Sequence, residues 1–343
     1  LSKYNVSKFK PKYILVNSGN ANACTGTVGM SNAIKCTKSI SKKFNCLKEN
    51  VLLSSTGIIG RQLPINKIIK SIEDHDFKFK STWKQAASAI MTTDKFSKHI
   101  TRSFILNKIK ITINAVCKGA GMIEPNMATM LSFISINVDL KKSLLLKILK
   151  KAVNSSFNTI SVDGDMSTND TVMLISTGEN KEFNFSVNTK ILKILENEIT
   201  NVCHDLSKMI IEDGEGATKI IKITVHKSYN SSQAKKIAYS LANSNLIKTA
   251  MYGADPNWGR IIARLGSINN INYDENKVSL KINNKIIFEN GLQSKKCNLN
   301  QLNKSMMKKN IAIDLYINSG KSNHTVLTSD LSHEYVHINS AYT

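Results

Sequence analysis

A threonine behind a turn-rich segment is the first group in this chain whose position could support covalent chemistry. Thr129 lies in the stretch 118–131, which contains two glycines and a proline that interrupt regular structure. The apolar run that follows, residues 130–136, has the alternation of a buried strand. A threonine at a loop-to-strand junction is ordinary, so these residues alone leave both a structural and a nucleophilic role open.

Other polar groups have the chemistry to assist a nucleophile. Thr56 stands beside Gly57, so a hydroxyl and a backbone N–H could face one developing oxyanion. Thr92 opens a short polar cluster that ends at Asp94, and an acidic glycine turn contains Glu215. Each also has a structural interpretation, as a tight turn or a solvated side chain, and the residues by themselves do not decide between the two.

Two segments resemble ligand-binding loops but lack a required residue. Residues 12–26 predict a strand, a loop of small residues and the approach to a helix, yet the Gly-Lys-Ser/Thr ending of a P-loop is absent. Residues 161–171 are rich in oxygen ligands, but Thr168 replaces the turn glycine of a calcium loop and Leu174 replaces its final glutamate. The sequence therefore supports neither nucleotide nor calcium binding at these loops.

The hydrophobic pattern predicts both strands and helices. Strands are predicted over residues 12–16, 51–54, 109–113, 130–136, 220–225, 278–282, 285–288, 311–318 and 325–330. Helices are predicted over residues 31–44, 65–72, 83–91, 143–153, 188–211 and 233–242. Asn283 and Asn284 are expected to join two strands as a hairpin. His333 and His337 fall in an expected strand, where a spacing of four is not the helical metal-ligand pair.

Composition favours a soluble globular protein in a reducing compartment. The 343 residues allow a large core and more than one subdomain, and 41% of them are apolar. No apolar run approaches the ~18 residues needed to span a bilayer, so no membrane association is expected. The six cysteines are widely spaced without a C-x-x-C pair, which favours a cytoplasmic location and neither zinc nor disulfides.

The net charge of +22 invites comparison with nucleic-acid-binding proteins. Only four of the 47 basic residues are arginines, although arginine is the preferred contact to bases and phosphates. The lysines are spread along the whole chain rather than gathered in one segment. We therefore expect no nucleic-acid partner.

Eight segments together resemble the ornithine acetyltransferase family, whose members are the glutamate N-acetyltransferases of the cyclic arginine pathway. The segments follow the family order and extend over nearly the whole chain, which makes the resemblance far more specific than any single motif. They are residues 16–26, 55–64, 91–94, 118–131, 162–178, 213–219, 248–261 and 330–342.

The resemblance implies that the precursor cuts itself between Ala128 and Thr129. Thr129 then carries a free α-amine, whose pKa near ~8 lets it accept the proton of its own hydroxyl at neutral pH. Thr129 would act as nucleophile and base, taking an acetyl group from N-acetylornithine and passing it to glutamate. No cofactor is implied, and the use of acetyl-CoA as a second donor, which would add amino-acid N-acetyltransferase activity, is left open.

The resemblance also implies roles for residues around Thr129. Thr56 and the N–H of Gly57 would form the oxyanion hole, which turns a weak sequence signal into a specific expectation. The substrate would be held by Thr129 itself and by a cation, a carboxylate and two neutral polar groups. These further ligands are Lys118, Glu215, Thr92 and Asn339.

The fold implied is α/β, a layered α-β-β-α sandwich of the DmpA/ArgJ-like type with a smaller C-terminal subdomain. Residues 1–128 would form the α chain and residues 129–343 the β chain, with 129–230 completing the sandwich and about 231–343 forming the subdomain and tail. Two α and two β chains are expected to assemble as a heterotetramer. Relative to the family, we expect the chain to lack several tens of residues before the first strand, and Thr343 to lie one place before the family's last substrate threonine.

The sequence is also compatible with two alternative functions. A related self-processing amidase or aminopeptidase would use the same nucleophile with water as the acceptor. A non-catalytic basic protein would remain uncut and bind duplex DNA in a salt-sensitive way. Release of ornithine with and without glutamate distinguishes the first alternative from a transferase, and processing of the chain distinguishes the second.

Overall fold

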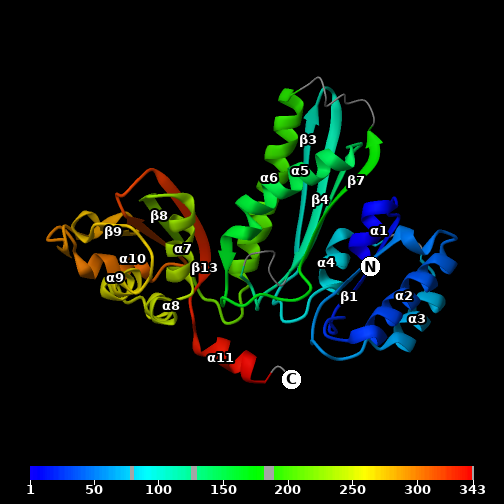
Figure 1. Cartoon of the computed structure of the whole chain (residues 1–343), viewed down its shortest axis with the longest axis horizontal. Coiled ribbons are helices and arrows are strands. Elements are labelled where there is room, and N and C mark those ends of the chain that lie inside the picture. The colour runs from blue at the N-terminus through cyan, green and yellow to red at the C-terminus, as the bar shows by residue number, and fades with distance from the viewer. Residues whose placement is uncertain (78–80, 125–129, 181–188, 342–343) are drawn as a thin grey trace.

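The computed structural model describes residues 1–77, 81–124, 130–180 and 189–341. Three sheets organise these residues, with strand orders β1-β2, β3-β4-β5-β7 and β11-β10-β9-β12-β8-β13-β6. The first two sheets and their helices form one body, and the third sheet forms a second body beside it (Figure 1).

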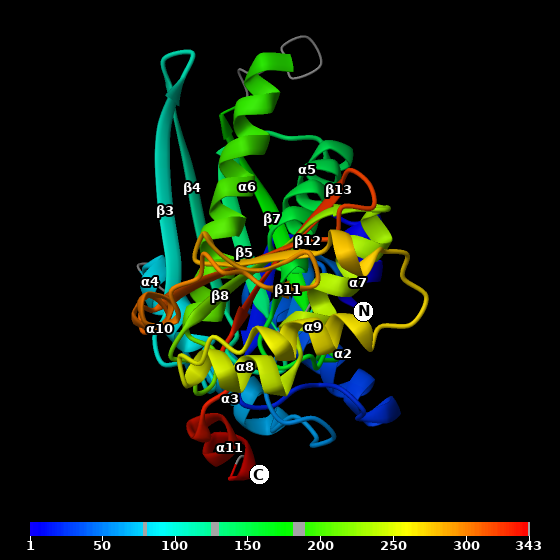
Figure 2. The same cartoon turned by 90° about the vertical axis from the view of Figure 1, so that its left-hand side faces the viewer.

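The four-stranded sheet contains β3 (Lys98–Leu106), β4 (Ile109–Lys118), β5 (Leu131–Val138) and β7 (Thr171–Asn180). β3, β4 and β5 are antiparallel neighbours, whereas β5 and β7 run parallel. Figure 2 shows the long β3–β4 pair beside α6 (Thr189–Glu212). β5 is buried on both faces, and five of its eight residues are apolar.

Helices cover one face of this sheet. α5 (Lys142–Ser155) and α6 pack there against alternate residues of β4 and β5, including Ile113, Ile134 and Ile136. These isoleucines have no exposed surface, and the apolar stripes of the two helices close the layer. This is the main hydrophobic core of the first body.

A parallel pair of strands forms the second sheet of the same body. β1 (Tyr13–Asn17) and β2 (Val51–Ser55) pack on one side against α2 (Gly26–Lys43) and α3 (Ile65–Asp74). Their other side, with α4 (Trp83–Ala89), packs against Val116, Leu131 and Phe133 of the larger sheet. The order is therefore helices, sheet, sheet, helices, and the predicted α/β sandwich is confirmed. α1 (Ser2–Lys8) lies at the edge, where Ser2 Oγ donates to Leu53 O at 2.9 Å.

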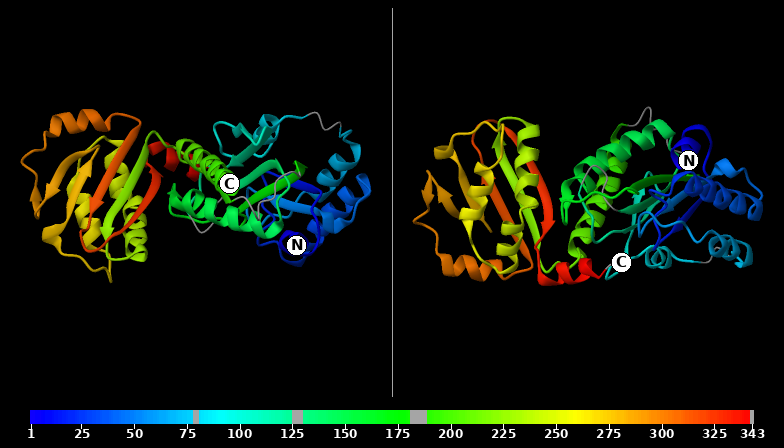
Figure 3. Two further views of the ribbon diagram at one scale, coloured as in Figure 1. Left: turned by 90° about the horizontal axis from the view of Figure 1, so that it is seen from above. Right: turned by 60° about the horizontal axis from the view of Figure 1, so that its bottom comes forward.

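The second body is a mixed sheet with helices on one face. Its strands are β6 (Ile160–Ser161), β8 (Ile220–Ser228), β9 (Ser279–Ile282), β10 (Lys285–Glu289), β11 (Leu292–Gln293), β12 (Asn310–Tyr316) and β13 (Ser322–Ser329). Its helices are α7 (Ser231–Ala242), α8 (Asn245–Tyr252), α9 (Trp258–Gly266) and α10 (Leu299–Met306). Three short 3-10 turns occur in the described parts of the two bodies together, with η1 (Lys48–Asn50) directly before β2 of the first body. The other two are η2 (Phe157–Thr159) and η3 (Glu275–Lys277). Figure 3 shows this sheet beside the sandwich in two further views.

Positive backbone φ angles make the turn of the predicted hairpin. Asn283 and Asn284 have φ of 48° and 65° and connect β9 to β10, as their sequence predicts.

β8, which precedes residue 231, lies inside the sheet of the second body. The domain boundaries expected from the sequence stay a prediction.

One sequence interpretation is wrong. The segment around His333 and His337 is the helix α11 (His333–Ser340), not a strand. Ser332 precedes it and donates its hydroxyl to Gly216 O at 2.6 Å, and Glu334 in the first turn suits a helix N-terminus. The two histidines therefore share a helix, but the described residues contain no group of three or more His, Cys, Asp or Glu side chains arranged to hold a metal.

Among the described residues, no helix is long and apolar enough to cross a membrane. All six cysteines are free thiols.

Candidate active site

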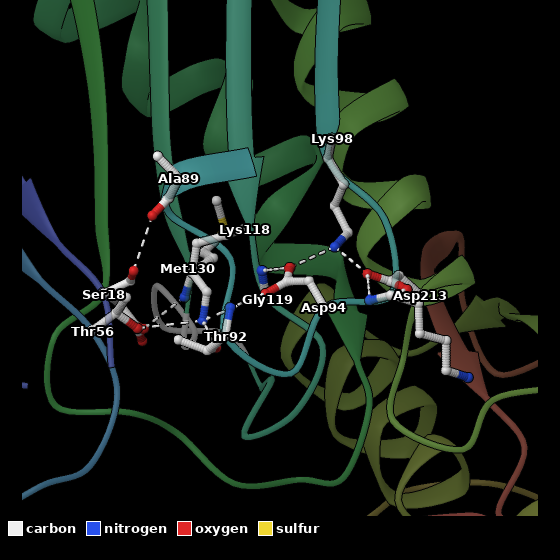
Figure 4. A network of polar contacts seen from close by, with 12 residues as sticks. Ser18, Thr56, Ala89, Thr92, Asp94, Lys98, Lys118, Gly119, Met130 and Asp213 are labelled. Carbon is white, nitrogen blue, oxygen red and sulfur yellow. Dashed lines mark hydrogen bonds and ion pairs between the residues drawn. The ribbon is translucent and has the colours of Figure 1, made fainter. Parts of the chain in front are cut away.

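The ammonium group of Lys118 is the centre of a polar cluster at the end of β4 (Figure 4). Its Nζ lies 2.7 Å from Thr92 Oγ1 and 3.3 Å from Thr56 Oγ1. Thr56 follows β2 and Thr92 follows α4, so three elements that are distant in sequence meet at this lysine. The structure thus brings together three of the predicted site residues.

Lys118 is 3% exposed. Burial lowers the pKa of Lys118, and the nearby carboxylate of Asp94 opposes this effect. The two hydroxyls accept hydrogen bonds from the ammonium, so the hydrogen of each hydroxyl is available for donation. A hydroxyl that accepts from a cation becomes a stronger donor, which suits a group facing a developing negative charge.

Gly57 is held in a conformation that other residues rarely adopt. Its φ is +125°, and a Cβ at this position would lie 2.2 Å from the carbonyl carbon of Gly19. The close approach joins the loop after β2 to the loop after β1, where Ala21 N donates to Ile58 O at 3.0 Å. Within the described part of the chain, the Gly57 N–H has no hydrogen-bond acceptor, as an oxyanion donor requires.

Glu215 and Asn339 form a second polar cluster. Asn339, on α11, donates from Nδ2 to Glu215 Oε2 at 2.9 Å. Glu215 is 7% exposed, and its N–H donates to Ala120 O at 2.9 Å, two residues beyond Lys118. A Cβ on Gly121 would lie 2.3 Å from Glu215 Oε2, so only glycine leaves room for this carboxylate. Charge from Glu215 also raises the pKa of Lys118, though less than Asp94 does, which places both clusters in one electrostatic environment.

The predicted cleavage site, Ala128 and Thr129, lies outside the described residues. The N–H of Met130, the residue after Thr129, donates to Asp170 Oδ1 at 3.0 Å, and Thr171 N donates to Met130 O at 3.0 Å. The other oxygen of Asp170 is buried without a hydrogen-bond partner among the described residues. Burial raises the pKa of Asp170 to about 8.

Sequence reasoning missed four ionisable groups in this region. Asp94, Lys98 and Asp213 form a buried ion-pair network beside Lys118, and Asp170 anchors Met130. Asp94 and Asp170 belong to polar segments used in the sequence analysis, residues 91–94 and 161–171, but the sequence assigns no role to their side chains. Lys98 carried no signal, because it is one of many lysines and begins a strand with ordinary alternation.

A model of the ArgJ family matches residues 1–343. The chain belongs to the ArgJ family. It is 41% identical over 333 residues to the arginine biosynthesis bifunctional protein ArgJ 1 of Clostridium acetobutylicum, covering 96% of this chain and 81% of that protein. The arginine biosynthesis bifunctional protein ArgJ of Pseudomonas fluorescens is 37% identical over 334 residues, covering 96% and 82%.

A solved member of the ArgJ family supports the same assignment. The crystal structure of the arginine biosynthesis bifunctional protein from Bacillus halodurans superposes with a TM-score of 0.57 and 29% identity. It covers 61% of this chain and 98% of the solved chain. These matches confirm three predictions from the sequence: the family, the acyltransferase class and a place in arginine biosynthesis.

Proposed function

We propose that this ArgJ-family chain is a self-cleaving acetyltransferase that moves the acetyl group of N2-acetyl-L-ornithine to L-glutamate, with Thr129 as nucleophile. The observation that carries the proposal is the cluster of Lys118, Thr56 and Thr92 at the end of β4, the strand that leads into the segment containing Thr129. The names of the relatives, which describe bifunctional proteins of arginine biosynthesis, support the choice of substrates.

Self-cleavage would create the catalytic group. Thr129 Oγ attacks the carbonyl carbon of Ala128, the C–N bond breaks, and the amide nitrogen takes a proton to become the α-amine of Thr129. Water then hydrolyses the ester and frees the carboxylate of Ala128. The products are an α chain ending at Ala128 and a β chain beginning at Thr129.

Acetyl transfer would follow a ping-pong course. The α-amine of Thr129 takes the hydroxyl proton as Oγ attacks the acetyl carbon, and that proton passes to the departing amine of ornithine. The amine of glutamate then attacks the acetyl-Thr129 ester and loses a proton, and Thr129 Oγ is reprotonated. Thr56 Oγ1 and the Gly57 N–H would donate to the oxyanion of each tetrahedral intermediate.

The charged groups would orient the amino-acid part of the substrate. Lys118 is a cation for a carboxylate, and Glu215 is a carboxylate for an ammonium group. Thr92 and Asn339, which contact these two residues, would fix their positions and contribute neutral hydrogen bonds. No cofactor is required by this scheme.

Denaturing electrophoresis with intact-mass measurement tests the self-cleavage. The 38.1 kDa chain should give fragments of about 14 and 24 kDa, in proportion to 128 and 215 residues. Thr129→Ala should give one uncut band. An uncut wild-type chain, or cleavage at another bond, would contradict the assignment of Thr129.

Incubation with N-acetylornithine, with and without glutamate, tests the transfer. A transferase should release ornithine and form N-acetylglutamate together, at a rate that depends on glutamate. Ornithine release that ignores glutamate would support the amidase alternative instead. A parallel reaction with acetyl-CoA and glutamate tests the second donor that the word bifunctional suggests for the relatives.

A further inference from the structure

A buried ion-pair network lies directly beside the candidate active site (Figure 4). Lys98, the first residue of β3, is fully buried, and its ammonium donates to Asp94 Oδ1 at 2.6 Å and to Asp213 Oδ2. Burial opposes the charge of Lys98, but the carboxylates outweigh this effect and raise its pKa. A buried ion pair often adds little to stability, because the cost of desolvating both charges offsets their attraction. The role of this network is therefore better sought in the residues that it contacts.

Asp94 is the member of the network that contacts the candidate site. Its Oδ1 also accepts from Gly119 N at 2.7 Å, and its Oδ2 accepts from Thr92 N at 3.0 Å. The same Oδ2 lies 3.9 Å from Lys118 Nζ. One carboxylate therefore fixes the backbone of Thr92, fixes the residue after Lys118, and faces the charge of Lys118.

Asp213 extends the network toward the second polar cluster. Its oxygens both accept from Lys95 N, at 3.1 Å each, and it precedes Glu215 by two residues. Lys98 thus connects the segment that carries Thr92 to the turn that carries Glu215.

The two lysines are neutralised to different degrees. Lys98 has two carboxylates within hydrogen-bond distance, whereas the carboxylate of Asp94 lies beyond hydrogen-bond distance from Lys118. Lys118 donates instead to the neutral hydroxyls of Thr56 and Thr92. Its charge therefore lacks a close counter-ion among the described residues, and a substrate carboxylate would provide one.

We propose that Lys98, Asp94 and Asp213 are positioning residues for acetyl transfer: Lys98 engages Asp94 and so prevents it from pairing closely with Lys118, which stays free for the substrate carboxylate. This inference rests on the proposed function. The network acts through Lys118 and Thr92 and does not itself contact the substrate.

The decisive test compares Lys98→Met with the double variant Lys98→Met, Asp94→Asn. Without Lys98, Asp94 should pair with Lys118, and the KM for N-acetylornithine should rise about 10- to 100-fold, in line with the loss of one charge-assisted contact. Removing the competing carboxylate in the double variant should lower that KM again. A purely structural role predicts that the second substitution makes the enzyme worse.

The pH dependence of kcat/KM provides a second readout. The charged or titratable groups that act on Lys118 are Asp94, Lys98, Glu215 and Asp170. Losing Lys98 removes a like charge and should move the basic limb to higher pH, whereas Asp94→Asn alone removes an opposite charge and should move it to lower pH. Poor folding alone would not shift the basic limb in opposite directions in these two variants.

Lys151→Met is the control for loss of a lysine ion pair outside the candidate site, because Lys151 donates to Glu196 Oε2 at 2.7 Å between α5 and α6, in the helical layer. The proposal is overturned if Lys98→Met raises KM no more than this control, or if adding Asp94→Asn to it fails to lower KM. If Lys98→Met does not fold, an unchanged basic limb in Asp94→Asn alone overturns it. An inactive wild-type enzyme would instead contradict the proposed function. This result needs no variant, so it is distinguishable from a failure of the network proposal.

Discussion

At the scale of single residues, the candidate site combines a buried cation with neutral partners. Lys118 donates to two threonine hydroxyls, and the adjacent Gly57 offers a backbone N–H without an acceptor among the described residues. Thr56 and Gly57 are held in place in the absence of substrate by contacts of their own backbones. Thr56 N donates to Asn17 O at 3.1 Å, and the Gly57 backbone packs against Gly19. Such preorganisation is what makes an oxyanion donor effective.

Gly57→Ala should damage both the fold and the activity. The substitution adds a Cβ 2.2 Å from Gly19 C at a φ of +125°, so the two loops must separate. We expect a loss of about 1–3 kcal/mol in the free energy of unfolding and about a 100-fold or greater loss in kcat. Thermal unfolding and steady-state kinetics measure the two effects.

Gly60→Ala is the matched control for this substitution. Gly60 also has a positive φ, +83°, but no atom lies within 4 Å of the position that a Cβ would take. It should therefore show the backbone cost alone, about 1 kcal/mol, with kcat nearly unchanged. Equal effects of the two substitutions would contradict the importance of the contact between the loops.

Asp170 predicts a pH-dependent stability. Its pKa is raised to about 8 by burial, so the native state keeps a proton that an unfolded aspartate loses near pH 4. Stability from this group is complete below pH ~4 and falls as the pH rises toward about 8, by at most about 1.4 kcal/mol per unit and less because the side chain is partly exposed.

Asp170→Asn should remove that dependence, since an amide does not titrate. Urea unfolding between pH 5 and 8 should show a smaller loss of stability for the variant than for the wild type. Asp165→Asn, which changes an exposed carboxylate in the same loop, serves as the control and should follow the wild type. Parallel curves for Asp170→Asn and the wild type would contradict the raised pKa.

At the scale of elements, Lys248 joins helices to strands of the second body. This residue of α8 is 3% exposed, and its ammonium donates to Val162 O at 2.8 Å, to Thr328 Oγ1 at 3.1 Å and to Ser329 O. Burial lowers the pKa of Lys248 to about 8. By donating to carbonyls at the ends of β6 and β13, the ammonium links α8 to these two strands.

Lys248→Met should destabilise the protein by about 2–4 kcal/mol, because it removes a buried ammonium that donates to two carbonyls and a hydroxyl. Denaturant unfolding measures the loss. Lys236→Met removes one exposed contact, to Asn269 O at 2.6 Å, and should cost less than about 1 kcal/mol. A small effect at Lys248 would mean that neighbouring groups or water replace its hydrogen bonds.

Elements with strong periodicity were predictable from the sequence, and those set by distant contacts were not. α6 and the β9–β10 hairpin follow from an apolar stripe and an Asn-Asn turn. The helix α11 was not predicted from residues 333–337, because its start depends on the contact of Ser332 with Gly216, which is distant in sequence. The Lys98 network was equally hidden, since Asp94 and Asp213 lie 119 residues apart in sequence and meet only in the fold.

At the scale of the whole molecule, the candidate site lies beside the junction of the two bodies. The turn that carries Glu215 leads from α6 into β8, and the segment before α11 returns from β13. Asp330 Oδ1 ties these crossings together by accepting from Thr218 N at 2.8 Å and from Lys219 N at 2.9 Å. Glu215 and Asn339 thus meet because these two connections between the bodies lie next to each other.

The proposed cleavage should leave the two chains associated. β4 precedes the cleavage site and β5 follows it, yet the strands pair from Ile113 opposite Ile136 to Lys118 opposite Leu131. We expect both fragments to co-elute in native gel filtration and to separate only in denaturant. Uncut Thr129→Ala should elute at the same volume, and fragments that separate in plain buffer would contradict this prediction.

Cleavage between β4 and β5 would also change how the protein can refold. Before cleavage, these neighbouring strands find each other within one chain, through a short connection that costs little entropy to close. After cleavage the same pairing requires two molecules to meet. Refolding of the mature protein should therefore depend on protein concentration, whereas refolding of the precursor should not. A cleaved protein would therefore be one in which β4 and β5 had paired before the chain was cut.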